Sequence, residues 1–281
     1  MKNMRKKYQG VIIPAVTPLT ESYLLDWEGV TMLLEHFRSA GVMPFILGTT
    51  GEAPSLSFSL KEEFVRLAIR LKQPGDVLYA GISSNCLEES VEMGKRYLSA
   101  GADVLVATLP SYYALNEGQM KRYFEKLADG IGGPVMVYNI PSTTHMSIPL
   151  QVIDELSRHP HIVGTKDSER SDERLKESLR LWAEREDFSH FLGWAARSAE
   201  AVLGGSDGLV PSSGNIDPVV YRDLYDAAIK GDRAEAERLQ HASDKLGERY
   251  QAGRSLGESL AALKGILEEM KLCGSTVMSP L

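Results

Sequence analysis

The chain has 281 residues, of which 43% are hydrophobic and 25% are charged, so it has the composition of a globular protein with a large buried core and is neither disordered nor fibrous. Its 31 basic and 38 acidic residues give a formal net charge of −7 without a basic run, so no nucleic-acid partner is expected. The apolar runs fall far short of the roughly 20 residues of a membrane-spanning helix, so no membrane partner is expected either.

The N-terminus and the cysteines give no sign of export. Four residues near the start are basic, namely Lys2, Arg5, Lys6 and Lys7, but residues 10–18 follow them instead of a long apolar stretch, so a signal peptide is not expected. Cys86 and Cys273 lie far apart in the sequence and form neither a disulfide framework nor a CxxC metal motif. We therefore expect a cytoplasmic protein, a class in which enzymes dominate.

Eight short apolar runs recur along the chain, with helical patterns between them. The runs are almost continuously apolar, as expected for strands covered on both faces. They span residues 11–17, 42–47, 77–81, 104–108, 135–139, 162–166, 188–193 and 208–212. Eight strands alternating with helices predict an α/β protein with a (β/α)8 TIM barrel.

The helical patterns carry start signals. Residues 27–40 are amphipathic, and Asp26 is the expected N-cap. In residues 59–72, Ser59 followed three residues later by Glu62 predicts a capping box. These signals place helices between the predicted strands.

An open doubly wound sheet is the main alternative to the barrel. That fold carries a glycine-rich phosphate-binding turn after its first strand. Here the first apolar run leads into Thr-Pro-Leu-Thr at residues 17–20, with no such turn. We therefore favour the barrel.

The strand pattern stops after residue 217, and helical patterns follow at residues 218–230, 233–250 and 256–270. These segments are too small and too amphipathic to fold alone, so we predict that they pack on the barrel flank or at a subunit contact. The chain is thus divided into a catalytic barrel, residues 1–217, and a C-terminal three-helix extension, residues 218–281.

Lys166 is the most informative candidate among the fourteen lysines. It directly continues an apolar strand, whereas the other thirteen lie in the N-terminal tail or in polar helical patterns, where solvent exposure is expected. Active sites of such barrels lie at this end of the strands. Burial favours the neutral amine, which is the nucleophile that forms a Schiff base with a ketone. The alternative is a structural ion pair with Asp167 or Glu52.

Two other strand ends supply polar groups. Tyr138 ends the fifth predicted strand, where a phenol either relays protons beside the lysine or is a rim tyrosine bonded to the backbone. The second strand leads into Gly48-Thr49-Thr50-Gly51, which either offers hydroxyl and N–H groups to a carboxylate or is a tight loop. The sequence contains no HExxH spacing and no cluster of metal ligands.

The ordered set of these motifs resembles the dihydrodipicolinate synthase / N-acetylneuraminate lyase family of Schiff-base (β/α)8 enzymes. The similarity runs over essentially the full length of the chain. It is carried by the segments GVIIPAVTP (10–18), GTTGE (48–52), YNIP (138–141), GTKD (164–167) and GSDG (205–208).

The resemblance implies a role for each matching residue. Lys166 would form the imine with C2 of a 2-oxo acid, usually pyruvate, and Tyr138 would relay protons. Gly48, Thr49 and Thr50 would hold the substrate carboxylate, and Thr50 would also take part in catalysis. The imine supplies the electron sink, so neither a cofactor nor a metal is expected.

The resemblance also implies an oligomer, because family members lend a tyrosine to a neighbouring subunit and are mostly tetrameric. In this chain that residue is Tyr113 or the adjacent Tyr112. A homotetramer or a dimer is therefore expected. His145 stands where the family usually has a glycine, and its ring faces either the substrate loop or solvent.

The departures from the family pattern concern the substrate. Dihydrodipicolinate synthases of the family bind a second carboxylate with an arginine at the position of Thr143, and threonine cannot reproduce bidentate binding. Sialic acid lyases carry an acidic pair after the glycine of the seventh strand, whereas residues 195–196 after Gly193-Trp194 are alanines. The remaining subgroup acts on 2-keto-3-deoxy sugar acids, which Thr143, Gly193, Ser168 and Ser212 would contact.

We therefore expect a lyase that cleaves or condenses a pyruvate unit with an aldehyde, with a 2-keto-3-deoxy sugar acid or a related compound as its substrate. A dehydratase or deaminase on the same scaffold is one alternative, since it needs the same imine. Dihydrodipicolinate synthase is a second alternative. A 2-oxo acid-binding regulator is the alternative outside the enzymes.

Overall fold

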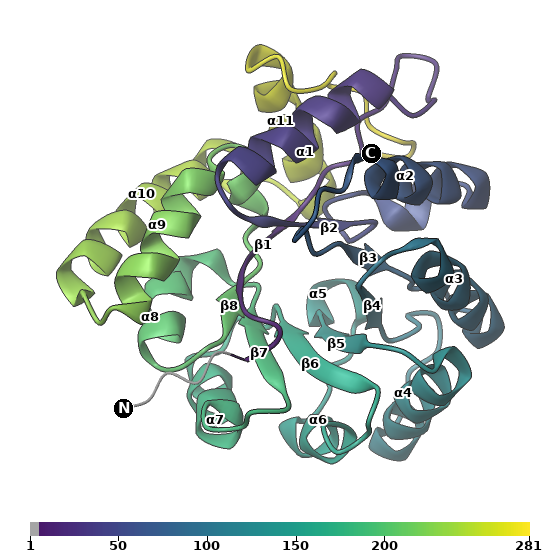
Figure 1. Ribbon diagram of the computed structural model, residues 1–281, viewed down its shortest axis with the longest axis vertical. Helices are drawn as coiled ribbons and strands as arrows, with labels where there is room; N and C mark the ends of the chain where they lie inside the picture. The colour runs from purple at the N-terminus through teal and green to yellow at the C-terminus, as the bar shows by residue number, and fades with distance from the viewer. Residues whose placement is uncertain (1–5) are drawn as a thin grey trace.

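The computed structural model describes residues 6–281, so the first five residues of the predicted barrel segment lie outside the described residues. Eight parallel strands form a closed barrel in chain order, and β1 pairs with β8 to close it (Figure 1). The strands are β1 (Gly10–Pro14), β2 (Met43–Ile46), β3 (Tyr79–Gly81), β4 (Val104–Thr108), β5 (Val135–Asn139), β6 (Ile162–Asp167), β7 (Ser189–Leu192) and β8 (Gly208–Leu209). The predicted (β/α)8 fold is confirmed.

Helices surround the barrel and continue into the C-terminal part of the chain (Figure 1). They are α1 (Trp27–Ser39), α2 (Phe58–Leu71), α3 (Leu87–Ala100), α4 (Glu117–Ile131), α5 (Pro141–Thr144), α6 (Leu150–Leu156), α7 (Asp172–Trp182), α8 (Ser198–Leu203), α9 (Pro218–Ile229), α10 (Arg233–Gln251) and α11 (Leu256–Glu269). Short 3-10 helices are η1 (Ala53–Ser55), η2 (Ala195–Arg197) and η3 (Ser212–Asn215). Residues 6–281 contain no helix that is both long enough and apolar enough to cross a membrane.

Two apolar layers explain why the strands read as continuous hydrophobic runs. Alternate strand residues point to opposite faces, one into the barrel and one toward the helices. The outer layer packs strand residues such as Ile13 and Leu105 against helix residues such as Phe37 and Phe124. The inner layer fills the barrel with the side chains of Ile12, Phe45, Tyr79, Val104, Val106, Met136, Tyr138 and Phe191, among others.

The helix starts agree with the sequence signals at one helix and differ at the next. The Asp26 side chain caps α1 as predicted. The capping box of Ser59 and Glu62 is wrong: α2 begins one residue earlier, and Ser57 is its N-cap. Ser57 has the extended backbone that a cap requires, and its hydroxyl accepts a hydrogen bond from the Leu60 N–H at 3.3 Å. Ser59 already lies in the first helical turn.

The C-terminal helices pack onto the barrel. Helix α9 contacts β1 and α8, and α10 packs along α9 and α8. Helix α11 packs against α10. The predicted break at residues 231–232 is confirmed, since Asp232 caps α10.

His190 in β7 is buried behind the barrel wall. Its Nδ1 atom lies 3.0 Å from the Ser206 hydroxyl, and its ring stacks on Trp182. Burial, with smaller contributions from the charges of Lys6 and Arg174, lowers the pKa of His190 to about 3. A histidine in the unfolded chain takes up its proton near pH 6.5. Between these two values the unfolded state binds more protons than the folded state, so the free energy of unfolding falls as the pH falls from 6.5 toward 3.

We expect His190→Asn to remove this dependence, because asparagine keeps a hydrogen-bonding group but does not titrate. As the pH falls from 6 to 4, the free energy of unfolding of the unmodified protein should decrease by about 1.4 kcal/mol more per pH unit than that of the variant. Urea denaturation at several pH values measures the slope. The exposed His145→Asn is the matched control and should leave the slope unchanged. Equal slopes in His190→Asn and the unmodified protein would contradict the assignment.

Candidate active site

The C-terminal ends of β2, β5 and β6 bring Lys166 and Tyr138 together inside the barrel. The two residues are direct partners across β5 and β6, and each is 4% exposed. The Lys166 ammonium nitrogen lies 3.8 Å from the centroid of the Tyr138 ring and 5.1 Å from that of Phe45. The Phe45 and Tyr138 rings meet edge to face at 6.5 Å. The amine thus sits in a nearly dry pocket of aromatic rings.

Lys166 has neither of the ion pairs that a structural role would require. Asp167 points to the opposite face of β6, where its carboxylate lies 2.6 Å from Arg174 Nε. Glu52 pairs at 2.6 Å with Lys264. Within residues 6–281, no carboxylate lies within ion-pairing distance of Lys166. The structural alternative is therefore wrong for both proposed partners.

Tyr138 faces the polar groups of the site. Burial opposes ionisation of its phenol, but the charge of Lys166 and hydrogen bonding with the side chains of Lys166, Thr49 and Ser168 outweigh burial and lower its pKa. Its partners are side chains at the ends of β2 and β6, whereas the rim-tyrosine alternative required the backbone. A phenol with a lowered pKa beside an amine is suited to accept and return a proton.

The loop that follows β2 is tight and also presents hydroxyl groups. Backbone hydrogen bonds join Gly51 N–H to Gly48 and Glu52 N–H to Thr49, each at 3.1 Å. Gly48 must lack a side chain, because a Cβ there would lie 2.8 Å from the Phe45 ring. Thr49 is half-buried, and its side chain reaches Tyr138. The tight-loop interpretation and the binding interpretation are therefore compatible.

Gly193 and Ser168 are adjacent for a steric reason. A Cβ at Gly193 would lie 2.1 Å from the Ser168 hydroxyl oxygen. The glycine after β7 therefore leaves the space that this hydroxyl occupies, and the hydroxyl reaches Tyr138. The sequence placed both residues at strand ends, but the contact between them appears only in the structure.

The loop that carries Thr143 is held by Asn139. The Asn139 side chain donates to Asp167 at 3.2 Å and accepts from the Ile148 N–H at 3.0 Å. Thr143 lies in α5, is half-buried, and has its hydroxyl 3.3 Å from the Ile140 carbonyl oxygen. Asparagine thereby connects both ends of this loop to β5 and β6.

Some predicted residues do not join this cluster within one chain. Tyr112 and Tyr113 lie beyond β4, are 79% and 74% exposed, and pack against each other edge to face. The Ser212 hydroxyl lies 2.7 Å from the Tyr250 hydroxyl of α10, so it is engaged by the C-terminal helices. His145 is exposed and adopts a left-handed backbone conformation with φ 57°.

Sequence analysis missed two buried lysines. Lys6 and Lys264 were expected to face solvent, but their side chains are 7% and 0% exposed and pair with Asp207 and Glu52. In α11 a signal was present, because Leu260 and Leu267 lie four residues before and three after Lys264 and share its helix face. A lysine in that register is buried with its apolar neighbours.

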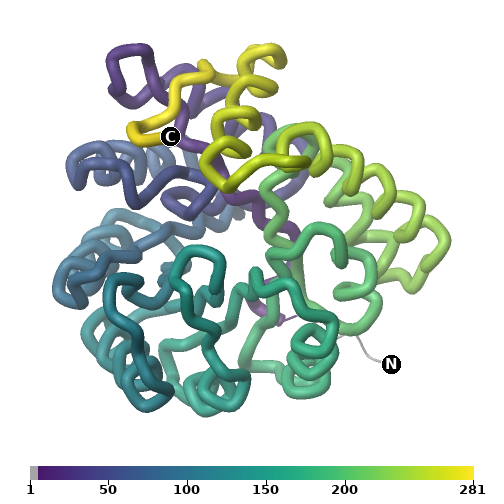
Figure 2. The backbone as a smooth tube through the Cα atoms, turned by 180° about the vertical axis from the view of Figure 1, so that it is seen from behind, coloured from purple at the N-terminus to yellow at the C-terminus, as the bar shows by residue number. Residues whose placement is uncertain are grey.

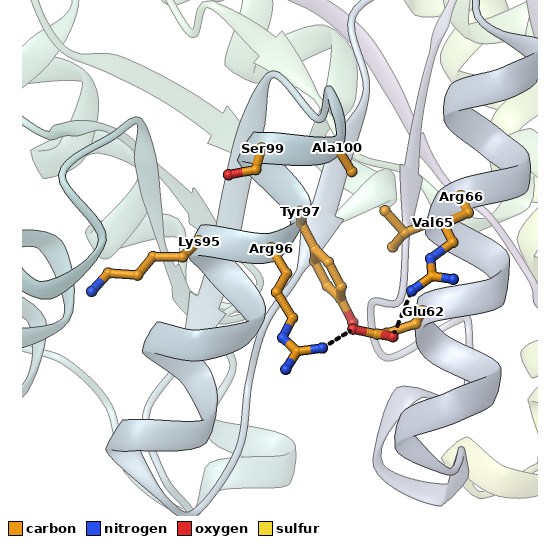
Figure 3. A pocket seen from close by; sticks show the side chains of 8 residues that line it. All are labelled: Glu62, Val65, Arg66, Lys95, Arg96, Tyr97, Ser99 and Ala100. Atoms are coloured by element: carbon orange, nitrogen blue, oxygen red, sulfur yellow. Dashed lines mark hydrogen bonds and ion pairs between the residues drawn. The ribbon is translucent and has the colours of Figure 1, made fainter.

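A second hollow lies away from the strand ends. It has a volume of about 400 Å³ and lies between α2 and α3 on the outer flank of the barrel (Figure 3). Glu62 forms ion pairs there with Arg66 and Arg96. None of the predicted site residues lines it. Residues 6–281 also contain no group of three or more His, Cys, Asp or Glu side chains arranged to hold a metal.

Comparison with known proteins agrees with this geometry. Residues 7–281 match the model of the dihydrodipicolinate synthetase family. The chain is 30% identical to an uncharacterized DapA-like lyase of Thermofilum pendens over 94% of this chain and 89% of the relative. It is 32% identical to a 4-hydroxy-tetrahydrodipicolinate synthase of Xylella fastidiosa over 80% of this chain and 74% of the relative.

Solved structures show the same similarity. Dihydrodipicolinate synthase of Bacteroides thetaiotaomicron has a TM-score of 0.93 and 31% identity, and the match covers 99% of this chain and 94% of that one. YagE of Escherichia coli K12, solved in complex with pyruvate, has a TM-score of 0.92 and 26% identity, with 98% and 93% of the two chains covered.

Proposed function

The chain belongs to the dihydrodipicolinate synthetase family and has its lyase fold, and from this premise we propose that it is a Schiff-base lyase that cleaves or condenses a pyruvate unit with an aldehyde. The observation that carries the proposal is the buried amine of Lys166, which has no carboxylate partner among residues 6–281 and lies on the Tyr138 ring. Such an amine is available to attack a carbonyl carbon.

The proposed reaction begins when the Lys166 ammonium passes its proton to the ionised Tyr138 phenol and the resulting amine attacks C2 of the 2-oxo acid. The carbinolamine loses water to give a protonated imine. In the cleavage direction the C4 hydroxyl gives up its proton, the C3–C4 bond breaks, and its electron pair passes to C3 as the aldehyde leaves. The resulting enamine takes a proton at C3, and water releases pyruvate and the free amine. Condensation is the reverse.

Tyr138, Thr49 and Thr50 have supporting roles in this proposal. The lowered pKa of the Tyr138 phenol suits it to exchange protons with the carbinolamine and the substrate hydroxyl. The hydroxyl groups of Thr49 and Thr50 and the N–H groups of their loop would hold the substrate carboxylate. The imine is itself the electron sink, so we propose that neither a metal nor a nicotinamide cofactor takes part.

We propose a 2-keto-3-deoxy sugar acid as the substrate class, because Thr143 stands where the resemblance implies an arginine in dihydrodipicolinate synthases. Thr143 and Ser168 offer neutral hydroxyls to a polyhydroxylated chain. The screen that tests this uses a panel of 2-keto-3-deoxy acids with pyruvate release as the readout. A dehydratase or deaminase would consume the acid without releasing pyruvate, and a regulator would bind it without turnover.

Dihydrodipicolinate synthase is the second candidate, since the relatives from Xylella fastidiosa and Bacteroides thetaiotaomicron carry that activity in their names. It would condense pyruvate with aspartate semialdehyde, whose carboxylate needs a cation. A charge-assisted hydrogen bond is worth about 1.5–3 kcal/mol, or roughly 10- to 150-fold in affinity. Thr143 supplies no charge for this contact.

We therefore expect kcat/KM for a 2-keto-3-deoxy sugar acid to exceed that for aspartate semialdehyde condensation. In Thr143→Arg the ratio of these two kcat/KM values should fall by about tenfold or more. Steady-state kinetics of both proteins with both substrates measure this. Thr143→Gln is the control, because it adds length without charge. Efficient condensation by the unmodified protein would overturn the substrate assignment and would make His145 in the same loop the first cation to examine.

The exposed Tyr112–Tyr113 pair supports a proposed oligomer, a homotetramer or a dimer, in which one of these rings enters a neighbouring subunit's site. Two aromatic rings that are 79% and 74% exposed are a large apolar surface to leave in water.

A further inference from the structure

A fully buried ion pair joins the carboxylate-binding loop to the C-terminal part of the chain. Glu52 directly follows the Thr49-Thr50-Gly51 loop, and Lys264 lies in α11. Both side chains are 0% exposed, and their charged atoms are 2.6 Å apart. In both views of the backbone, the C-terminal segment lies beside the N-terminal part of the chain (Figures 1 and 2).

The last residues of the chain complete the same contact. The second carboxylate oxygen of Glu52 accepts the Met278 N–H at 2.6 Å. The Lys264 ammonium donates to the Thr276 carbonyl oxygen, also at 2.6 Å. We call the set formed by the Glu52 and Lys264 side chains and the backbone of residues 276–278 the C-terminal clamp. Both charges of the clamp are thereby hydrogen-bonded as well as paired, which a buried ion pair requires.

The loop held by the clamp has a backbone that needs support. Leu47 and Glu52, which flank it, both have left-handed conformations, with φ values of 58° and 55°. Non-glycine residues rarely adopt this region and do so where the surroundings fix them. On one side the Thr17 hydroxyl donates to the Gly51 carbonyl oxygen at 2.6 Å. On the other side, the Glu52 side chain ties the loop to the clamp.

We propose that Glu52 and Lys264 are positioning residues that hold Thr49 and Thr50 in the geometry needed to bind the substrate carboxylate. This inference rests on the proposed function of the loop. Neither residue touches the substrate, since both are enclosed by protein. The clamp transmits the position of the C-terminal segment to the loop, so it acts on carboxylate binding and leaves the Lys166 amine itself unchanged.

The test is the concentration of pyruvate that gives half-maximal borohydride labelling of Lys166. In Lys264→Met we expect this concentration to rise about tenfold or more, while labelling at saturating pyruvate still reaches the level of the unmodified protein. We expect the half-saturating concentration to change without the saturating level because, in the variant, the loop is disordered or displaced while the Lys166 amine is intact. Steady-state kinetics should likewise change KM for the 2-oxo acid more than kcat.

The matched control is Lys6→Met, which breaks the other buried lysine–carboxylate pair. Lys6 lies 2.8 Å from Asp207 at the N-terminal end of the barrel, away from the loop. We expect Lys6→Met to lower the thermal midpoint without moving the half-saturating pyruvate concentration. This control separates loss of stability from loss of loop geometry.

A double variant keeps the test informative where Lys264→Met does not fold because it leaves a buried carboxylate unpaired. Glu52→Gln combined with Lys264→Met removes both charges, so it should regain stability while the half-saturating concentration stays raised. A double variant in which stability and the unmodified half-saturating concentration return together would show a purely structural pair and overturn the inference.

The same experiment distinguishes a failure of the proposed function from a failure of the positioning role. Absence of labelling in the unmodified protein contradicts the proposed function. Labelling of the unmodified protein, with the same half-saturating concentration in the clamp variants, contradicts the positioning role alone.

Discussion

Replacing Lys166 by methionine is expected to lower kcat/KM by about 10⁴-fold or more and to abolish borohydride labelling, because the proposed nucleophile of the covalent intermediate is lost. Methionine fits the space between the Phe45 and Tyr138 rings without a charge, so the fold should persist. Lys166→Arg should be equally inactive, since the guanidinium keeps its proton and cannot form the imine. Steady-state kinetics and the thermal midpoint measure activity and folding separately.

The control for this change is Lys176→Met, the same substitution at an exposed position of α7. It should leave kcat/KM within about twofold of the unmodified protein, because exposed substitutions away from a site have small effects. A folded Lys166→Met protein that retains a tenth of the activity would show that the reaction does not pass through an imine on this residue.

Removing the Tyr138 hydroxyl is expected to lower kcat by about 10²- to 10⁴-fold, the range typical of general acid–base groups. Tyr138→Phe keeps the ring that packs on Lys166 and Phe45, so pyruvate should still bind and label slowly. Rapid-quench measurement of imine formation separates this slow proton transfer from weak binding.

Tyr79→Phe is the matched control for the phenol. Tyr79 also lies inside the barrel, but within residues 6–281 its hydroxyl has no hydrogen-bond partner. Its removal should therefore leave both imine formation and turnover near the unmodified values. If Tyr138→Phe behaved like Tyr79→Phe, the phenol would have no part in proton transfer.

The barrel was predictable from the sequence because strands covered on both faces leave an unmistakable pattern. Each apolar run could be aligned with a strand, and the lysine at the end of the sixth run stood out for that reason. Lys166 and Tyr138 were identified as neighbours because parallel strands in chain order place consecutive strand ends side by side. The site was therefore predictable from the sequence where it is formed by residues at strand ends.

Contacts between residues distant in the sequence were not predictable in this way. The pairing of Glu52 with Lys264 depends on how α11 and the last residues return to the second strand, which no local pattern encodes. The engagement of Ser212 by Tyr250 depends on the packing of α10 against η3. The capping error at Ser59 is of another kind: Ser57 and Ser59 are both of a residue type that caps helices, only Ser59 has a glutamate three residues later, and the backbone nevertheless makes Ser57 the cap.

The proposed substrate class is supported by fewer residues than the proposed reaction is. Lys166, Tyr138 and the Thr49-Thr50 loop support imine chemistry on any 2-oxo acid. In the proposed function the choice of aldehyde depends on Ser168 and on the loop after β5, where Thr143 and His145 stand at positions that the resemblance assigns to an arginine and a glycine. Kinetic comparison of sugar acids with aspartate semialdehyde consequently tests the proposed substrate class separately from the imine chemistry.

The central claim is tested most directly by treating the unmodified protein with borohydride in the presence of pyruvate and locating the adduct by peptide mass spectrometry. We expect one reduced adduct per chain, on the peptide that contains Lys166, and none when pyruvate is omitted. An unmodified Lys166 at saturating pyruvate, or an adduct on another lysine, would contradict it.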